Sequence, residues 1–547
     1  MNENWTDLAS YDVLGVLGKV GKHEQNGVKV QLKLFLDENR VEQSFGDPAL
    51  ELFSHDDVCP QRERLALETR YASLLEETDE FSRKTVSYQG NKGEMVHGWI
   101  RYKEGFSAEL VTVLCRKFGM QPGDIILDPF AGSATTLLVA RSLGIDAFGI
   151  ELLPVCHLAW EAKSHVFDYD IGELRRLRSQ ILETEPDGVA DQFPHVPITE
   201  GAFPPQTEHD LMFFTRWCDN LPVTPLTEML CRLALTSILE EISYTRKDGQ
   251  YLRWDCRSPK TQMRNRLRLA QGKTPFQKMN KGALSSVKEA LIGALDIIVA
   301  DIEKLQRFSS RDSHQELIKG NTLLVLPTLQ ADQFTGVITS PPYCNRYDYT
   351  RTYALEIAYL NAGQQIHDLR QGMLSCTVEN HPKLDVLAQH YEALGQQERY
   401  ARILKVVQNN PAFMEINQAL QTRWDRGEIN NRGVLGMVQQ YFTELAFVFA
   451  EILRVCRHGA HIAFVNDNVR YGGEVIPVDL LTTNLAAELG FEPVTVCVLP
   501  QRKGNSSQQM GRFGRRPLRK SVTVWKKSQN LRGRGSRTWG AFDWIDQ

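Results

Sequence analysis

The sequence lacks the features that mark membrane and secreted proteins. None of its apolar runs reaches the roughly 18 to 20 residues that a membrane-spanning helix needs. The first residues, MNENWTDLASYD, contain no basic segment followed by an apolar one, so we expect no secretory signal and a cytoplasmic protein. With 547 residues, 42% hydrophobic and 24% charged, the composition is typical of a globular chain with more than one domain.

Paired cysteines are also missing. The ten cysteines stand singly, and no C-x-x-C pair or cysteine–histidine cluster has the spacing of a zinc site. We therefore expect no metal and no disulfide framework, and we expect the thiols to be reduced and mostly buried.

Acidic residues are absent from the C-terminal stretch between Gln501 and Trp539, although the whole chain carries a net charge of −4. The same stretch is rich in lysine and arginine. This segregation of charge predicts either a polyanionic partner or a solvated basic tail.

The clearest structural unit is GDIILDPFAGSATTLLVARSLGIDAFGIELLP, residues 123–154. A short apolar strand, a turn, a helix that ends at Gly144 and a second strand make a β-α-β unit. Strands and helices alternate again toward the C-terminus, and two helical stretches interrupt them. The pattern predicts an α/β fold, a Rossmann-like doubly wound sheet with two mainly helical insertions.

The expected domain boundaries follow from this pattern. The core comprises residues 96–155, 317–360 and 433–527, with insertions at 156–316 and 361–432, an N-terminal region of unclear role at 1–95 and a basic tail at 528–547.

A first candidate site lies where the strand IIL ends. Asp128 stands at the carboxyl end of that strand, where open α/β sheets bind ligands, and Gly132 permits a tight turn. Ser133 or Thr135 can cap the next helix, and Glu151 ends the second strand, from which a carboxylate can reach ribose hydroxyls. The glycine spacing is not G-x-G-x-x-G, so a cofactor with a cationic amino-acid end, S-adenosylmethionine, fits better than a pyrophosphate. The alternative is a capped turn with a solvent-facing aspartate.

A second candidate site is Ser340-Pro341-Pro342-Tyr343, which follows the strand GVIT. Two prolines end a strand because they lack the N–H that the ladder needs, and they stiffen the backbone. Their exposed carbonyls and the Ser340 hydroxyl can accept hydrogen bonds from the amino group of a nucleobase, which frees its lone pair to attack a methyl sulfonium. The Tyr343 ring offers a face on which an extruded base can stack. Alone, such a turn is more often structural.

Together, DPFAGSATT and TSPPY resemble the cofactor and catalytic motifs of the S-adenosylmethionine-dependent DNA amino-methyltransferases, which act on cytosine N4 or adenine N6. EGFSAELV is similar to the segment that precedes the family's cofactor motif, and IKGNTLLVLPTL to the strand that follows it. The resemblance implies that cofactor-binding residues are Phe106, Ser107, Asp128, Pro129, Phe130, Ala131, Gly132, Ser133, Thr135, Glu151 and Asn321.

The resemblance further implies that Ser340 to Tyr343 hold a flipped target base. Serine at the first position is more typical of enzymes that modify cytosine N4. Ala134 stands where the family has a second glycine, and Cys344, one residue past the tyrosine, is interpreted as structural and not as a nucleophile. A place in a restriction-modification or phage-defence system, with a companion restriction endonuclease as a candidate partner, is also implied.

Two segments are candidate contacts to double-stranded DNA. Residues 242–273 interleave basic and aromatic side chains, which suits phosphate contact and base stacking, and residues 501–520 are basic and rich in Gln and Asn. We expect the first insertion to be the main specificity element; the alternatives are a solvated helical face and a mobile loop. The predicted DNA-binding residues are Arg246, Lys247, Arg253, Trp254, Arg257, Arg264, Arg502, Lys503, Arg512, Arg515 and Arg516.

Two other functions remain open from the sequence. An RNA or tRNA base methyltransferase would use the same fold and a similar turn, and a non-catalytic DNA-binding protein could keep a degenerate version of the fold. The intact Asp128 and the complete Ser340–Tyr343 turn favour catalysis over binding alone.

Overall fold

The computed structural model describes residues 53–247, 252–276, 279–308, 312–500 and 511–528. The chain divides into two compact units, Met1–Phe45 and Gly46–Gln547, and every described residue belongs to the second. Two of the predicted DNA contacts, Arg502 and Lys503, lie outside the described residues.

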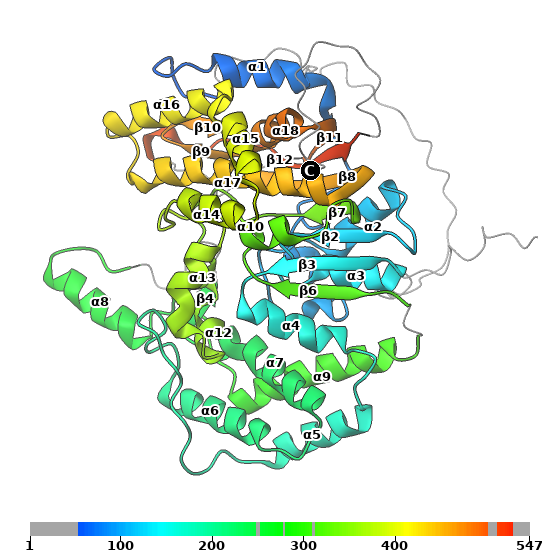
Figure 1. Cartoon of the computed structure of the whole chain (residues 1–547). Coiled ribbons are helices and arrows are strands. Elements are labelled where there is room, and N and C mark those ends of the chain that lie inside the picture. Colours follow the sequence, from blue (N-terminus) through cyan, green and yellow to red (C-terminus); the bar gives the residue numbers. More distant parts are fainter. Residues whose placement is uncertain (1–52, 248–251, 277–278, 309–311, 501–510, 529–547) are drawn as a thin grey trace, which may run out of the picture. The chain divides into compact units, whose positions relative to one another are not determined.

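An eight-stranded sheet forms the centre of the described chain, in the order β1-β11-β12-β8-β7-β2-β3-β6 (Figure 1). Only β12 runs antiparallel to its neighbours in this sheet. The predicted Rossmann-like α/β fold is confirmed. The strands are β1 (Leu75–Glu77), β2 (Ile125–Asp128), β3 (Asp146–Glu151), β6 (Gln315–Lys319), β7 (Phe334–Thr339), β8 (Cys456–Asp467), β11 (Phe491–Val498) and β12 (Lys520–Lys527).

The strand order reverses between β2 and β7. From β2 the chain continues through β3 and β6 toward one edge, whereas β7 and β8 extend the sheet on the other side of β2. Such a switch point leaves a crevice at the carboxyl ends of the two strands, which is where doubly wound sheets bind their ligands.

The β-α-β unit has the boundaries that its residues predict. The apolar stretch IIL forms β2, and α3 (Thr135–Leu143) ends at Gly144, whose φ of 74° closes the helix in the left-handed conformation. Before it, α2 (Ala108–Lys117) has Ser107 as its N-cap, and the Ser107 side chain accepts a hydrogen bond from the Leu110 N–H.

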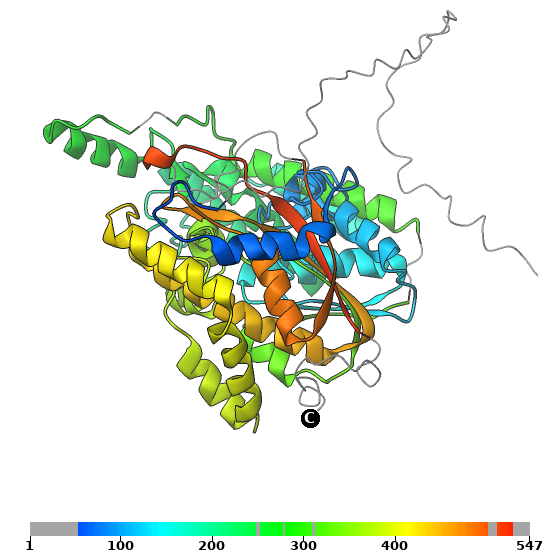
Figure 2. The same cartoon turned by 90° about the horizontal axis from the view of Figure 1, so that it is seen from above.

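The first insertion is mainly helical and carries the small hairpin β4–β5. Its helix α8 has one buried residue, Thr261, and in both views it projects from the rest of the described chain (Figures 1 and 2). Its elements are α4 (Pro154–Ser164), α5 (Ile171–Glu183), α6 (Pro205–Asp219), α7 (Pro225–Ile242), β4 (Thr245–Lys247), β5 (Leu252–Trp254), α8 (Pro259–Ala270) and α9 (Val287–Leu305).

The second insertion follows the turn after β7 and is also helical. It leads into the long buried helix α17, which packs against α15, α16 and α18. The remaining helices are α1 (Arg62–Tyr71), α10 (Thr322–Val325), α11 (Tyr349–Thr352), α12 (Ala354–Tyr359), α13 (Ile366–Gly372), α14 (Leu384–Ala393), α15 (Gln397–Gln408), α16 (Pro411–Asp425), α17 (Gly433–Val455) and α18 (Val478–Leu489). The hairpin β9 (Val469–Tyr471)–β10 (Glu474–Ile476) and the 3-10 turns Ala72–Leu74, Tyr88–Asn91, His97–Trp99, Leu326–Thr328, Gly363–Gln365 and Gly511–Phe513 complete the described elements.

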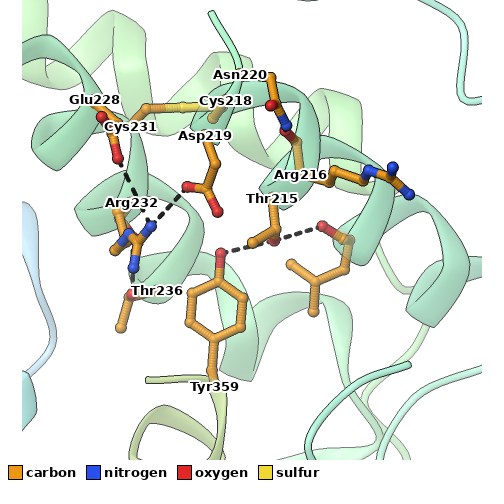
Figure 3. Close-up of a disulfide and its surroundings, with 11 residues drawn as sticks. Thr215, Arg216, Cys218, Asp219, Asn220, Glu228, Cys231, Arg232, Thr236 and Tyr359 are labelled. Atoms are coloured by element: carbon orange, nitrogen blue, oxygen red, sulfur yellow. Dashed lines mark hydrogen bonds and ion pairs between the residues drawn. A yellow bond between two sulfur atoms is a disulfide. The ribbon is translucent and has the colours of Figure 1, made fainter. Parts of the chain in front are cut away.

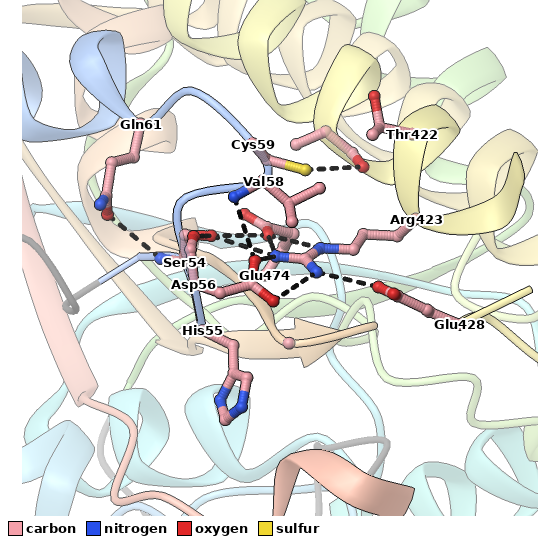
Figure 4. A network of polar contacts seen from close by, with 12 residues as sticks. Ser54, His55, Asp56, Val58, Cys59, Gln61, Thr422, Arg423, Glu428 and Glu474 are labelled. Atoms are coloured by element: carbon pink, nitrogen blue, oxygen red, sulfur yellow. Dashed lines mark hydrogen bonds and ion pairs between the residues drawn. The ribbon is translucent and has the colours of Figure 1, made fainter. Parts of the chain in front are cut away.

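A buried ionic network links distant parts of the chain (Figure 4). Arg423 of α16 lies 2.6 Å from Glu474 of β10 and 2.9 Å from Glu428, and it also reaches Asp56 in the N-terminal segment. Arg64 of α1 adds a 2.9 Å contact to the same Glu474. The network therefore joins the start of the described chain to the second insertion and the C-terminal part of the core.

The expectation that all cysteines are reduced is wrong for one pair. Cys218 at the end of α6 is bonded to Cys231 of α7, and near them the hydroxyls of Thr215 and Tyr359 lie 2.8 Å apart and link α6 to α12 (Figure 3). No spacing motif marks this pair in the sequence, because the packing of two helices brings the thiols together. The free cysteines are buried, except for half-buried Cys256.

None of the helices in the described ranges has the length and apolar character that crossing a membrane requires, and no group of three or more His, Cys, Asp or Glu side chains there could hold a metal ion.

Candidate active site

A cavity opens at the switch point, where the turns after β2 and β7 meet. It encloses about 760 Å³, counting space that is open to solvent. Its wall combines the turn after β2, the ends of β3 and β6, the turn after β7 and two further segments near Glu104 and Met373. The predicted site residues that line it are Phe106, Phe130, Ala131, Gly132, Ser133, Thr135, Glu151, Asn321, Ser340 and Pro342.

Other predicted residues stand behind this wall. Five of them do not line the cavity: Ser107, Asp128, Pro129, Pro341 and Tyr343. Asp128 accepts a hydrogen bond from the N–H of the lining residue Phe130, and each of the others is next in the sequence to a lining residue. The two motifs, which are about 200 residues apart in the sequence, nevertheless form one site.

Asp128 is buried, not solvent-facing, and connects the two turns. Its carboxylate accepts hydrogen bonds from the hydroxyls of Thr136 at 2.6 Å and Thr339 at 2.8 Å, and from the Phe130 N–H at 3.2 Å. Burial raises the pKa of Asp128 to about 6, although the three donors act in the opposite direction. Because Thr339 immediately precedes Ser340, Asp128 fixes the turn after β7 relative to the turn after β2.

Glu151 closes the turn after β2 from the other side. One carboxylate oxygen accepts the N–H groups of Leu152 and Leu153, each at 2.8 Å, and the other accepts the Gly132 N–H at 2.8 Å. An ionised carboxylate has about four acceptor positions, so Glu151 keeps one for a ligand hydroxyl.

The start of α3 differs from the sequence prediction. Neither Ser133 nor Thr135 caps the helix; Ala134 occupies the N-cap position with φ of 63° and makes no side-chain cap bond. The turn is instead held by Asp128 and Glu151, which satisfy the N–H groups of Phe130 and Gly132. Ser133 and Thr135 remain in the cavity wall.

The turn after β7 is held by a second polar cluster. The Ser340 hydroxyl lies 3.0 Å from the Tyr343 hydroxyl, and the Lys520 ammonium group of β12 lies 5.1 Å from the centre of the Tyr343 ring. Asp467 at the end of β8 lies 3.5 Å from the Lys520 ammonium. The antiparallel strand β12 thus supplies a cation beside the predicted catalytic tyrosine.

Comparison with known proteins agrees with this geometry. A family model described as DNA methylase, of the N6 and N4 type, matches residues 59–159. The Type II methyltransferase M.BsoBI of Geobacillus stearothermophilus is 53% identical over 490 residues, 89% of this chain and 96% of that protein. The chain belongs to the Type II DNA amino-methyltransferases. M.AvaI, a Type II methyltransferase of Nostoc sp., is 38% identical over 478 residues, which are 84% of this chain and 92% of that protein. No solved structure matches the methyltransferase.

The family implies S-adenosylmethionine as methyl donor, and the cavity of this methyltransferase fits such a group chemically. Its described lining contains two carboxylates, Glu104 and Glu151, and no lysine or arginine. A pocket with that charge suits a ligand that carries sulfonium and ammonium groups.

Several residues of the cavity wall were not predicted from the sequence. Glu104 is the first residue of the segment EGFSAELV, although no role was assigned to it, and Tyr102 lies two residues before it, so both were within reach of that resemblance. Met373 and Leu374 come from the second insertion and Tyr349 from the core segment before it, and no local pattern marks them. They reach the site only through the fold.

The predicted DNA contacts of the methyltransferase divide into two groups. The side chains of Arg246, Arg253 and Arg264 are exposed, and so are those of Arg512 and Arg515. The remaining described ones, Lys247, Trp254, Arg257 and Arg516, are buried or half-buried.

Lys247 does not reach the surface. Its side chain is 3% exposed, and its ammonium pairs with Glu356 of α12 and lies 4.7 Å from the centre of the Tyr353 ring. Lys247 therefore fixes the hairpin β4–β5 to the wall of the site, and its side chain is not available to DNA. Sequence alone could not separate it from its exposed neighbour Arg246.

Proposed function

We propose that this methyltransferase moves a methyl group from S-adenosylmethionine to N4 of a cytosine that is flipped out of double-stranded DNA. The observation that carries the proposal is the shared cavity: Ser340 and Pro342 line the same space as Gly132, Glu151 and Asn321. A base held by Ser340 and Pro342 would therefore lie next to a cofactor held by the turn at Gly132 and by Glu151 and Asn321. The serine at the first position of the catalytic turn supports cytosine N4 over adenine N6.

The cofactor end of the cavity would use the residues that the family resemblance implies. Glu151 has one acceptor position left for a ribose hydroxyl, and Asn321 stands at the end of β6, beside the expected place of the adenine ring. When bound, S-adenosylmethionine supplies an electrophilic methyl group on a sulfonium.

The catalytic turn would orient the amino group. The Ser340 hydroxyl can donate to the Tyr343 hydroxyl at 3.0 Å, which leaves the lone pairs of its oxygen available as acceptors. An amino N–H that donates to Ser340 turns the nitrogen lone pair away from the ring system and toward the methyl carbon. The turn would hold the amino nitrogen while its bond to the methyl carbon forms and the bond from that carbon to the sulfur breaks, and the extra proton of the nitrogen would pass to solvent.

The proposed DNA surface includes α8 and the hairpin β4–β5. From Cys256 to Lys288 the sequence has no acidic residue, and α8 exposes Met263 (65%) and Leu267 (54%) beside its arginines. A projecting basic helix of 12 residues has the size of an element that enters the major groove. We propose as contacts Arg246, Arg253, Trp254, Arg257, Arg264, Arg512, Arg515 and Arg516, together with Arg502 and Lys503.

The proposal extends to biological context. Both full-length relatives are named Type II methyltransferases, which supports a role in a restriction-modification system with a companion endonuclease.

The test is long-read sequencing of DNA from a methylation-free host that expresses the chain. A variant with Ser340→Ala and Tyr343→Ala serves as the control. The expected result is N4-methylcytosine within one recurring sequence, absent from the control. N6-methyladenine in its place would contradict the assignment of the base. Unmodified DNA with methylated tRNA would indicate an RNA substrate, and no methylation at all from a folded protein would indicate a binding protein.

A further inference from the structure

Glu104 brings a carboxylate with open acceptor positions into the cavity wall. One oxygen, Oε2, accepts a hydrogen bond from the Tyr353 hydroxyl. The Tyr347 hydroxyl also acts on the carboxylate, but the other oxygen, Oε1, is buried and has no hydrogen bond of ordinary geometry among the described residues. A carboxylate has about four acceptor positions, and leaving part of them unfilled in a buried place is costly, so they indicate a place where a ligand supplies a donor.

The segment that holds Glu104 is rigid. The Tyr102 and Tyr353 rings stack with their centres 5.1 Å apart, and the Lys103 N–H donates to the Tyr353 hydroxyl at 2.9 Å. Glu104 is therefore fixed through Tyr353, and only its soft terminal torsion remains to adjust Oε1 to a ligand.

The cations of the described chain that act on Glu104 are Lys247 and Lys103, and neither forms an ion pair with it. The nearby Lys247 ammonium is already paired with Glu356 on the other side of Tyr353. Burial raises the pKa of the Glu104 carboxyl, against the effect of the Tyr353 and Tyr347 hydroxyls and of Lys247. A cationic ligand would favour the ionised form.

The other acids of the site are occupied. Asp128 accepts three hydrogen bonds behind the wall, and Glu151 accepts three backbone N–H groups. Glu104 thus has the greatest free acceptor capacity among the carboxylates of the site, and it adjoins the turn at Gly132. A Cβ atom added to Gly132 would lie 2.7 Å from the Tyr102 ring, so the segment with Glu104 packs directly on that turn.

We infer that Glu104 binds the α-ammonium group of the methionine moiety of S-adenosylmethionine. The inference rests on the proposed function and gives a role to the first residue of the segment EGFSAELV, a role that the resemblance itself did not assign. An ammonium group offers three N–H donors and a full charge, which matches the open acceptor positions of a carboxylate beside the turn after β2. The target base is the other group that the oxygen could meet, and it is an outcome of the test below.

The test compares two ligands by titration calorimetry on the full chain. S-adenosylhomocysteine carries the ammonium group, whereas 5′-methylthioadenosine has the same adenosine and sulfur without the amino-acid end. For Glu104→Gln we expect 10- to 100-fold weaker binding of S-adenosylhomocysteine, as for loss of one charged hydrogen bond, and less than twofold change for methylthioadenosine. Glu151→Gln is the matched control and should weaken both ligands, because both contain the ribose.

Each other outcome has a distinct meaning. Equal loss for both ligands, or no loss for either, would overturn the role of Glu104. Unchanged affinity for S-adenosylhomocysteine with weaker binding of target duplex would assign Glu104 to the base instead. If the wild-type chain bound neither ligand, the proposed cofactor itself would be wrong.

A second variant covers the case in which Glu104→Gln does not fold. Tyr353→Phe removes the hydroxyl that donates to Glu104 and accepts the Lys103 N–H, so it should weaken binding of S-adenosylhomocysteine by a few-fold and leave binding of methylthioadenosine unchanged. Equal effects on the two ligands would again overturn the inference.

Discussion

At the scale of single residues, the site depends on carboxylates with different tasks. Asp128 and Glu151 accept hydrogen bonds that shape the turn after β2, whereas Glu104 keeps an oxygen for a ligand. The position of Asp128 at a strand end could be predicted from the sequence, but its burial could not. Burial depends on Thr339, which is 211 residues away and arrives with β7.

Asp128 should make the stability of the protein depend on pH. Its pKa of about 6 in the folded state lies above the usual 3.8, so the folded state binds the proton more tightly than the unfolded state does. Lowering the pH from 7 to 5 therefore favours folding through this residue, by roughly 1 kcal/mol. We expect the difference in unfolding free energy between wild type and Asp128→Asn to rise by that amount, measured by urea denaturation at both pH values. A difference that stays constant or falls would show that Asp128 is ionised at pH 5.

Gly132 should be needed for cofactor binding. Its φ is 52°, and an added Cβ atom would lie 2.7 Å from Cε1 of Tyr102, which cannot retreat because it stacks on Tyr353. We expect Gly132→Ala to weaken binding of S-adenosylhomocysteine at least tenfold, or about 1.4 kcal/mol, in calorimetry.

The control for this variant is Gly119→Ala. Gly119 also has a positive φ, 66°, but nothing lies within 4 Å of its added Cβ atom. Gly119→Ala should lower the free energy of unfolding without changing the affinity for S-adenosylhomocysteine. Similar affinities for the two variants would mean that the contact with Tyr102 is unimportant.

At the scale of elements, local patterns predicted most of the core. The ends of β2, α3 and β7 follow apolar runs that stop at or just before glycine or proline, and the structure confirms them. The N-cap of α3 was wrong because two carboxylates from outside the helix replace a capping side chain. The parts of the site from the second insertion and the burial of Lys247 depend on tertiary packing, which no local pattern records.

Helix α8 provides an element-scale prediction. If Arg264 and Arg266 contact phosphates, Arg264→Gln with Arg266→Gln should weaken duplex binding and reduce the salt dependence of log Kd by about two units, one per contact. The measurement is fluorescence anisotropy with labelled duplex at several salt concentrations. Affinity for S-adenosylhomocysteine should not change.

Arg62→Gln on α1 is the control, because Arg62 is exposed (91%) and lies on an element outside the proposed surface. If that substitution reduced the salt dependence as much as the α8 variant did, binding would reflect overall charge and not α8.

At the scale of the whole molecule, the described chain is interrupted by insertions yet tied together by buried charges. Arg423 contacts Glu474, Glu428 and Asp56, which come from three separate parts of the sequence (Figure 4). Arg423 and Glu474 are both almost fully buried, at 0% and 1% exposure of their side chains. Such a network contributes little net stability as a whole, but removal of one partner leaves charges buried without compensation.

We therefore expect Arg423→Met to lower the unfolding free energy by about 3 to 5 kcal/mol. The comparison is Arg426→Met three residues away, whose side chain is 50% exposed and pairs only with Glu428 in the described contacts; it should cost less than about 1 kcal/mol. Urea denaturation followed by tryptophan fluorescence measures both. Because Arg423 holds the segment around Asp56 against α16 and β10, Arg423→Met should also make that segment more sensitive to limited proteolysis under native conditions. Equal costs for the two variants would mean that the buried network does not hold the N-terminal segment, the second insertion and the core together.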